Sequence, residues 1–237
     1  MFLVIQEQLI LFICFHIFMY IFFPNKKKED KIKLVNIFLR TIHGIGCIYY
    51  ILPIIYTNNF LLTDINYEGP YDENEYIITR SIKYFVWDIL ALFIEEEKEK
   101  NMYIYHHILS IIAIYSGMMC RMNNYNIVMG LFIGEITNPI QQVIDIFKVI
   151  KYRNIPIEVI FLVIFTFVRG IIGSRTLLLI IVEINTIVIS DIMIDYGCIF
   201  SYLINVITYI ILIPVSMHWS YRKYFSIYKY SDKKMLI

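Results

Sequence analysis

Long apolar segments recur along almost the whole chain, and they restrict the fold more than any other feature of the sequence. A run of about 20 apolar residues is long enough for a helix to cross the hydrocarbon core of a bilayer. About seven such segments can be counted, and they are residues 2–23, 34–56, 80–94, 103–120, 125–147, 156–183 and 197–219. With 59% hydrophobic residues, the chain is too apolar for one soluble core. The sequence therefore predicts an all-α fold, a polytopic helical membrane protein.

The distribution of lysine and arginine predicts an orientation for this protein. Basic residues gather after the first, third, fifth and seventh segments, whereas the opposite loops carry few of them. The basic groups are Lys26 to Lys33, Lys98 and Lys100, Lys148 to Arg153, and Arg222 to Lys234. Because cytosolic loops are enriched in basic residues, we expect the N-terminus in a lumen and the C-terminus in the cytosol. The alternation also favours an odd number of membrane spans.

The chain divides into three parts on this evidence. Residues 1–33 are interpreted as an anchor helix with a basic cytosolic loop, because the first segment lacks a basic start and ends in Phe23-Pro24 rather than in small residues. Residues 34–220 form the main membrane domain, and residues 221–237 a basic cytosolic tail. No linker is long enough for a second folded domain.

Ionisable side chains lie inside several of the predicted spans. A charge in the membrane interior costs a few to more than about ten kcal/mol, so such residues usually mark a functional site. At 1.5 Å of rise per residue, His106 and His107 lie within about 6 Å of the cytosolic edge, and Asp88 lies at about 9 Å. We expect Asp88 to contact one of these histidines. His43 lies about 13 Å deep, and either lines a cavity or packs between helices.

Polar residues of the fifth and sixth segments also point to the bundle interior. Four of them share one helical face beside Pro139, namely Glu135, Asn138, Gln142 and Asp145. They either surround a cavity or join helices by hydrogen bonds. Proline in a helix frees a backbone carbonyl, which needs another partner. Arg169 lies at nearly the same depth as Glu135, so we expect an ion pair between them, with Arg169 at the cavity.

Other classes of site have little support in the sequence. We find no glycine-rich phosphate loop, no paired-cysteine motif and no spacing typical of a metal site, so we expect no metal and no nucleic-acid partner. Four cysteines are too few for a disulfide scaffold. Cys120 and Cys198 both fall near the lumenal edge, so a disulfide between them is one alternative.

The polar motifs together resemble the TLC domain. They are an Arg-x-x-His helix (Arg40, His43), a Lys-Tyr-Phe-x-x-Asp helix ending at Asp88, the His106-His107 pair, Glu-Ile-Thr-Asn-Pro from Glu135, and Phe-x-Arg ending at Arg169. The resemblance covers about residues 34–220 and is strongest to small TLC-domain-containing transmembrane proteins. It implies a helical bundle that encloses a lipid cavity, here between the second to sixth spans and open toward the cytosolic leaflet.

The resemblance extends more distantly to ceramide synthases, which are acyl-CoA-dependent N-acyltransferases of the endoplasmic reticulum. It implies candidate catalytic residues His106, His107, Asp88 and Glu135, and cavity residues His43, Asn138, Gln142, Asp145 and Arg169. Those enzymes carry a second aspartate where this chain has Asn138, and an amide cannot take up a proton. A neutral His107, oriented by Asp88 or Glu135, would act as general base or accept the acyl group.

Three functions follow from these observations. The first is membrane-lipid homeostasis, through binding, sensing or handling of fatty-acyl or sphingolipid species. The second is a ceramide-synthase-like lipid acyltransferase with fatty acyl-CoA as co-substrate, and the third a trafficking or cargo receptor. Each implies membrane lipids as partners, the endoplasmic reticulum as the location and no bound cofactor. A homodimer is left open.

Overall fold

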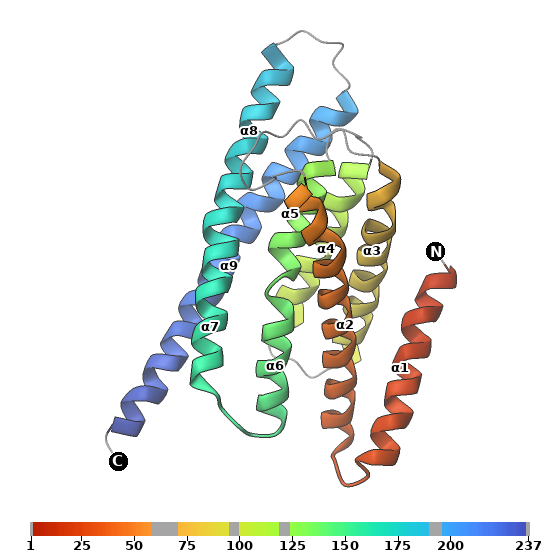
Figure 1. The fold of residues 1–237 in the computed structure, drawn as a ribbon, viewed down its shortest axis with the longest axis vertical. Helices are drawn as coiled ribbons and strands as arrows, with labels where there is room; N and C mark the ends of the chain where they lie inside the picture. Colours follow the sequence, from red (N-terminus) through yellow and green to blue (C-terminus); the bar gives the residue numbers. More distant parts are fainter. Residues whose placement is uncertain (1, 58–70, 95–99, 119–123, 190–195, 236–237) are drawn as a thin grey trace.

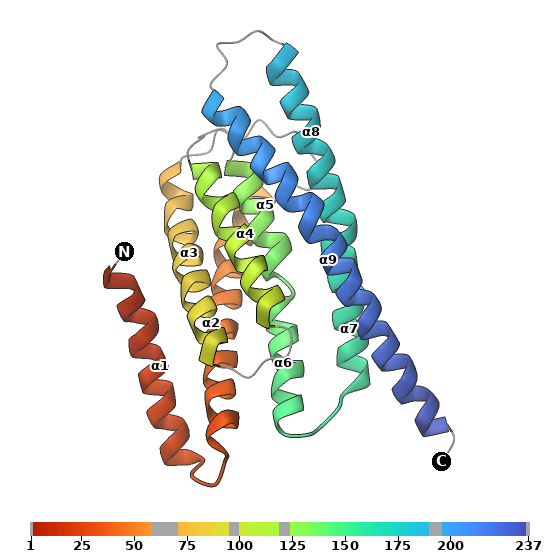
Figure 2. The ribbon, with the colours of Figure 1, turned by 180° about the vertical axis from the view of Figure 1, so that it is seen from behind.

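The apolar segments form helices in the computed structural model, which describes residues 2–57, 71–94, 100–118, 124–189 and 196–235. The first four segments are single helices, and the fifth and sixth are each divided. In chain order the elements are α1 (Phe2–Phe22), α2 (Lys28–Thr57), α3 (Tyr71–Ile94), α4 (Lys100–Met118), α5 (Asn124–Glu135), α6 (Asn138–Val149), α7 (Ile155–Thr166), the π-helix η2 (Phe167–Ile172), α8 (Gly173–Ile189) and α9 (Tyr196–Met235). Figures 1 and 2 show them as one elongated bundle.

Local sequence explains where several helices begin. Glu29 and Asp30 occupy the first turn of α2, where negative charge is favourable to the helix dipole. The side chain of Asn154 caps α7 by accepting a hydrogen bond from the Ile157 amide, 3.2 Å away. Pro139 lies at the start of α6, where its missing N–H costs nothing. The same proline cannot continue α5, so the predicted fifth span is broken at Ile136 and Thr137.

The surface of the bundle is that of an integral membrane protein. Large apolar side chains are exposed on the outside of nearly every helix, for example Tyr56, Phe93, Ile112, Val163, Leu178 and Phe200. A water-soluble monomer rarely exposes so much apolar surface. In the described residues, four segments are long and apolar enough to cross a membrane: Lys28–Thr57, Tyr125–Val149, Ile155–Asn185 and Gly197–Tyr230. The full count of seven spans stays a prediction.

Helix α2 lies at the centre of the packing around the polar residues. It contacts α1, α3, α5 and α6, while α9 contacts α4, α7 and α8. The main apolar core contains Ile51, Phe85, Tyr125, Met129 and Tyr202, from four different helices. A smaller cluster of Met19, Val35, Leu39 and Trp87 attaches α1 to α2 and α3. Helix α1 therefore packs on one side of the bundle (Figure 1).

Two sequence predictions concern the C-terminal part of α9 and the cysteines near the lumenal edge. Helix α9 continues to Met235, past the boundary predicted at residue 220, and the basic cytosolic tail at residues 221–237 stays a prediction. Cys120 lies outside the described residues, so its disulfide with Cys198 stays a prediction.

Candidate functional site

Asp88 joins two basic side chains from neighbouring helices. Its Oδ1 accepts a hydrogen bond from Arg40 Nε of α2 at 2.8 Å, and its Oδ2 lies 2.8 Å from His107 Nε2 of α4. Asp88 is 4% exposed and His107 is 7% exposed, so this cluster is shielded from solvent. The predicted contact between Asp88 and a histidine is confirmed, and the histidine is His107.

The environment of His107 suits a base whose orientation is fixed. Its ring stacks on Phe85, with ring centroids 5.1 Å apart. Since Nε2 faces Asp88, the other nitrogen is left to interact elsewhere, and Nδ1 has no hydrogen-bond partner in the described part of the chain. A carboxylate on one imidazole nitrogen orients the ring and makes the other nitrogen a better base. The His106 ring lies 5.4 Å away and near Trp219 of α9.

The break between α5 and α6 presents further polar groups. Glu135 ends α5 and is 2% exposed. Asn138, at the start of α6, donates from Nδ2 to Glu135 Oε2 at 2.7 Å. Gly44 of α2 allows the close approach here, because a Cβ at this position would lie 3.2 Å from Cδ of Pro139. The interrupted helix therefore places an amide and a carboxyl group side by side against α2.

Arg169 lies at this level of the bundle but does not form the predicted ion pair. Its guanidinium donates from NH2 to the Gly134 carbonyl at 2.7 Å and from NH1 to Ser216 Oγ at 3.4 Å, and lies over the Phe165 ring. In the described residues, no ion pair joins Arg169 to Glu135, so that prediction is wrong. The break after α5 leaves the Gly134 carbonyl without its helical partner, and Arg169 on the π-helix reaches this backbone group instead. π-Helical turns are common at functional sites.

A polar cavity of about 440 Å³ opens beside these residues. Its wall includes the predicted residues Asp88, His106, His107, Glu135, Asn138, Gln142, Asp145 and Arg169. Basic side chains line it as well, namely Lys33, Arg40, Lys148, Arg222 and Lys223. Asp145 is paired with exposed Lys148 at 2.6 Å, so it belongs to the outer part. The predicted cavity is present, and its basic part lies at the helix ends that we expect to face the cytosol.

A second, smaller pocket of about 80 Å³ lies deeper between α4, α5 and α9. Its wall is largely apolar, with Phe85, Ala113, Ile114, Leu131 and Leu212 among its residues. His106, Glu135 and Arg169 line both this pocket and the polar cavity. These three residues therefore stand at the boundary between a polar and an apolar space.

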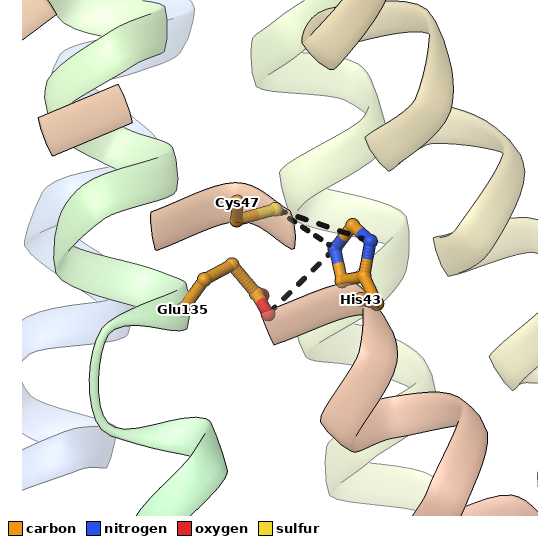
Figure 3. Close-up of side chains that lie close together, drawn as sticks. All are labelled: His43, Cys47 and Glu135. Carbon is orange, nitrogen blue, oxygen red and sulfur yellow. Dashed lines mark hydrogen bonds and ion pairs between the residues drawn. The ribbon is translucent and has the colours of Figure 1, made fainter. Parts of the chain in front are cut away.

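His43 is placed differently from the other predicted cavity residues. It is 3% exposed and is not among the residues that line either of the two cavities described above. Its ring stacks on Tyr84, with centroids 3.7 Å apart. Figure 3 shows the ring between Cys47, one turn further along α2, and Glu135 of α5. His43 therefore lies behind the cavity wall and is not part of its surface.

The sequence analysis missed the contribution of α9 to both cavities. Polar residues of this helix face inward at helical spacing, and they are Asn205, Thr208, Ser216 and Ser220. Trp219 lines the polar cavity near Tyr103. The signal was the spacing of these polar residues along one face of an otherwise apolar segment.

Comparison with known proteins agrees with this geometry. A family model described as the TLC domain matches residues 33–223. The chain belongs to the TLC domain family. No curated protein matches the chain. The TLC domain match begins within α2 and ends within α9, so it contains every lining residue of both cavities except Ser226 and leaves α1 outside. The sequence resemblance to the TLC domain is thereby confirmed.

Proposed function

We propose that this TLC-domain protein binds a membrane lipid with a fatty-acyl chain and acts in membrane-lipid homeostasis. The observation that carries the proposal is the shared wall of the two cavities at His106, Glu135 and Arg169. An amphiphile needs a polar space for its headgroup next to an apolar space for its chain. The polar cavity of about 440 Å³ suits the headgroup, and the apolar pocket suits part of the chain.

The charge of the polar cavity favours a headgroup with an anionic part. Lys33, Arg222 and Lys223 supply positive charge in its wall, with Lys223 3.8 Å from the Glu158 carboxylate. The charges of Lys148 and Asp145 offset each other in their ion pair. Basic side chains at this depth attract phosphate and other anionic headgroups of the cytosolic leaflet. Fatty-acyl and sphingolipid species that carry such a group are therefore the ligands we expect, in the endoplasmic reticulum membrane.

Lipid binding is tested by changing the apolar pocket alone. Ala113 lines this pocket and not the polar cavity, so Ala113→Leu shortens the space without altering a polar group. The expected result is that lipid extracted from the purified protein, identified by mass spectrometry, shifts to shorter acyl chains or is lost. Ile112→Leu is the control, because Ile112 directly precedes Ala113 in the same helix and is 45% exposed. An identical lipid profile in both variants and the parent would contradict the proposal.

A second function, acyl transfer from fatty acyl-CoA, is favoured by the Asp88–His107 contact. The carboxylate holds the imidazole in place, and Nδ1 of His107 has no partner in the described residues. As general base, this nitrogen would take a proton from a lipid amine or hydroxyl, whose nitrogen or oxygen attacks the thioester carbonyl and displaces the CoA thiolate. His106 and Arg169, which line both cavities, would bring N–H donors to the developing oxyanion.

The two functions are separated by an activity assay. Purified protein is incubated with fatty acyl-CoA and a panel of long-chain bases and lysolipids, beside a His106→Ala, His107→Ala double variant. Product formation that is lost in the double variant would establish the acyltransferase. Retained lipid without any transfer in either form would support lipid binding alone.

Asn138→Asp is a further variant, since it introduces the second carboxylate found in ceramide synthases. A gain of acyl transfer in this variant would identify Asn138 as the residue that prevents it.

A further inference from the structure

Three metal-binding types of side chain converge behind the cavity wall. His43 and Cys47 lie one turn apart on α2, and Glu135 reaches them from the end of α5 (Figure 3). Cys47 Sγ is 3.3 Å from His43 Nε2, which is 3.7 Å from Glu135 Oε2. One ligand atom from each residue lies within 4.8 Å of the other two. All three side chains are buried.

These separations are close to those around a tetrahedral zinc ion. Zinc binds sulfur at about 2.3 Å and nitrogen or oxygen at about 2.0–2.2 Å. Tetrahedral angles then place a sulfur and a nitrogen ligand about 3.5–3.6 Å apart, and a nitrogen and an oxygen ligand about 3.3–3.5 Å apart. The observed 3.3 Å from sulfur to nitrogen and 3.7 Å from nitrogen to oxygen each differ from these values by about 0.2 Å, which small side-chain rotations can supply. The donor set of thiolate, imidazole and carboxylate suits zinc and similar transition metals, whereas calcium and magnesium prefer oxygen ligands alone.

The charge of Glu135 is a second observation in favour of a metal ion, independent of the distances between the ligand atoms. The carboxyl group is 2% exposed inside a membrane domain, yet no lysine or arginine within the described residues pairs with it. Arg169, its expected partner, donates to the Gly134 carbonyl instead. A divalent cation held by the Glu135 carboxylate, the Cys47 thiolate and a neutral His43 forms a neutral group. Such a group removes most of the cost of placing an unpaired carboxylate in the membrane interior.

The surroundings also hold the three ligands in place. Asn138 donates to Glu135 Oε2 at 2.7 Å, and Ser81 Oγ lies 3.6 Å from Cys47 Sγ. Tyr84 stacks on the His43 ring and prevents it from turning. Groups of this kind, which hydrogen-bond or pack on metal ligands, orient them and raise metal affinity.

We propose that His43, Cys47 and Glu135 bind a divalent transition-metal ion, and that the preferred ion is zinc. The ion fastens α2 to the end of α5, at the point where the helix is interrupted before α6. With three protein ligands, one tetrahedral position remains for water or another small ligand. The metal site shares Glu135 with the wall of both cavities, whereas His43 and Cys47 line neither of them, so metal content tests this site separately from lipid binding.

The test is to measure the metal content of the purified, full-length protein by elemental mass spectrometry. The affinity tag contains no histidine, and the cells are grown with added zinc. We expect close to one zinc ion per chain in the parent and in Cys14→Ala, because Cys14 is an exposed cysteine on α1. We expect the ion to be lost in Cys47→Ala. Parent protein without zinc after growth in zinc, or full zinc in Cys47→Ala, would overturn the proposal.

Two further measurements keep the test decisive if Cys47→Ala does not fold. Glu135→Gln keeps the size of the side chain and removes a ligand charge, so zinc affinity should fall at least about ten-fold, the lower range for losing a supporting group. Cobalt exchanged into the parent protein should give a thiolate-to-cobalt absorption band in the near ultraviolet. Cobalt binding without this band would show that Cys47 is not a ligand and would overturn the site.

Discussion

At the scale of single residues, the Asp88 carboxylate is the group on which the candidate site depends most. It accepts from Arg40 at 2.8 Å and contacts His107 at 2.8 Å, away from solvent. Asp88→Asn keeps the shape and removes the negative charge between two basic side chains. Because breaking a buried ion pair costs about 3–5 kcal/mol, we expect a large loss of stability. Unfolding of the purified protein in mixed detergent micelles measures it.

The matched control for this prediction is Asp145→Asn, the same substitution at the outer part of the polar cavity. Asp145 pairs with Lys148, whose side chain is 54% exposed. Exposed ion pairs contribute only about 0–1 kcal/mol, so this variant should remain close to the parent. Equal stability of the two variants would show that the Asp88 contacts contribute no more than a surface pair.

At the scale of helices, Gly44 marks a close contact between α2 and the start of α6, against the ring of a proline rather than the end of a flexible side chain. A Cβ at Gly44 would lie 3.2 Å from Pro139 Cδ and 3.4 Å from Asn138 Cβ, so Gly44→Ala pushes the two helices apart. We expect a cost of about 1–3 kcal/mol, the range for overpacking. The melting temperature in detergent measures this change, and the Asn138–Glu135 contact should loosen with it.

Gly46→Ala is the control in the same helix. A Cβ there would meet only Arg80, at 3.6 Å, which is ordinary van der Waals contact. Both substitutions gain the same helix propensity of about 0.8–1.0 kcal/mol, so this gain cancels in the comparison. If Gly44→Ala were as stable as Gly46→Ala, α2 and α6 would not be closely packed at this point.

At the scale of the whole molecule, the sequence predicted the fold class and the polar interior for clear physical reasons. Hydropathy located the helices, and depth along them correctly brought Asp88 to the histidine pair, without selecting His107 over His106. Depth and helical face cannot determine which of two nearby acceptors a side chain uses. Arg169 therefore received the wrong partner, because the break before Pro139 exposed a backbone carbonyl that the sequence analysis assigned to no side chain. The inward face of α9 was missed because its serines and Asn205 are uncharged.

The number of membrane crossings decides on which sides of the membrane the two ends of the molecule lie. Seven spans place the N-terminus in the lumen and the C-terminus in the cytosol, whereas an even number places both on one side. The deciding helix is α1, because it lies outside the residues matched by the TLC domain and packs on one side of the bundle. The chain has no Asn-x-Ser/Thr acceptor of its own, so one added at either end reports its side by glycosylation. We expect glycosylation of the N-terminal acceptor only. Modification of neither acceptor would contradict the predicted topology and indicate that α1 lies along the membrane surface rather than across it. Modification of the C-terminal acceptor would contradict the predicted cytosolic side of the C-terminus.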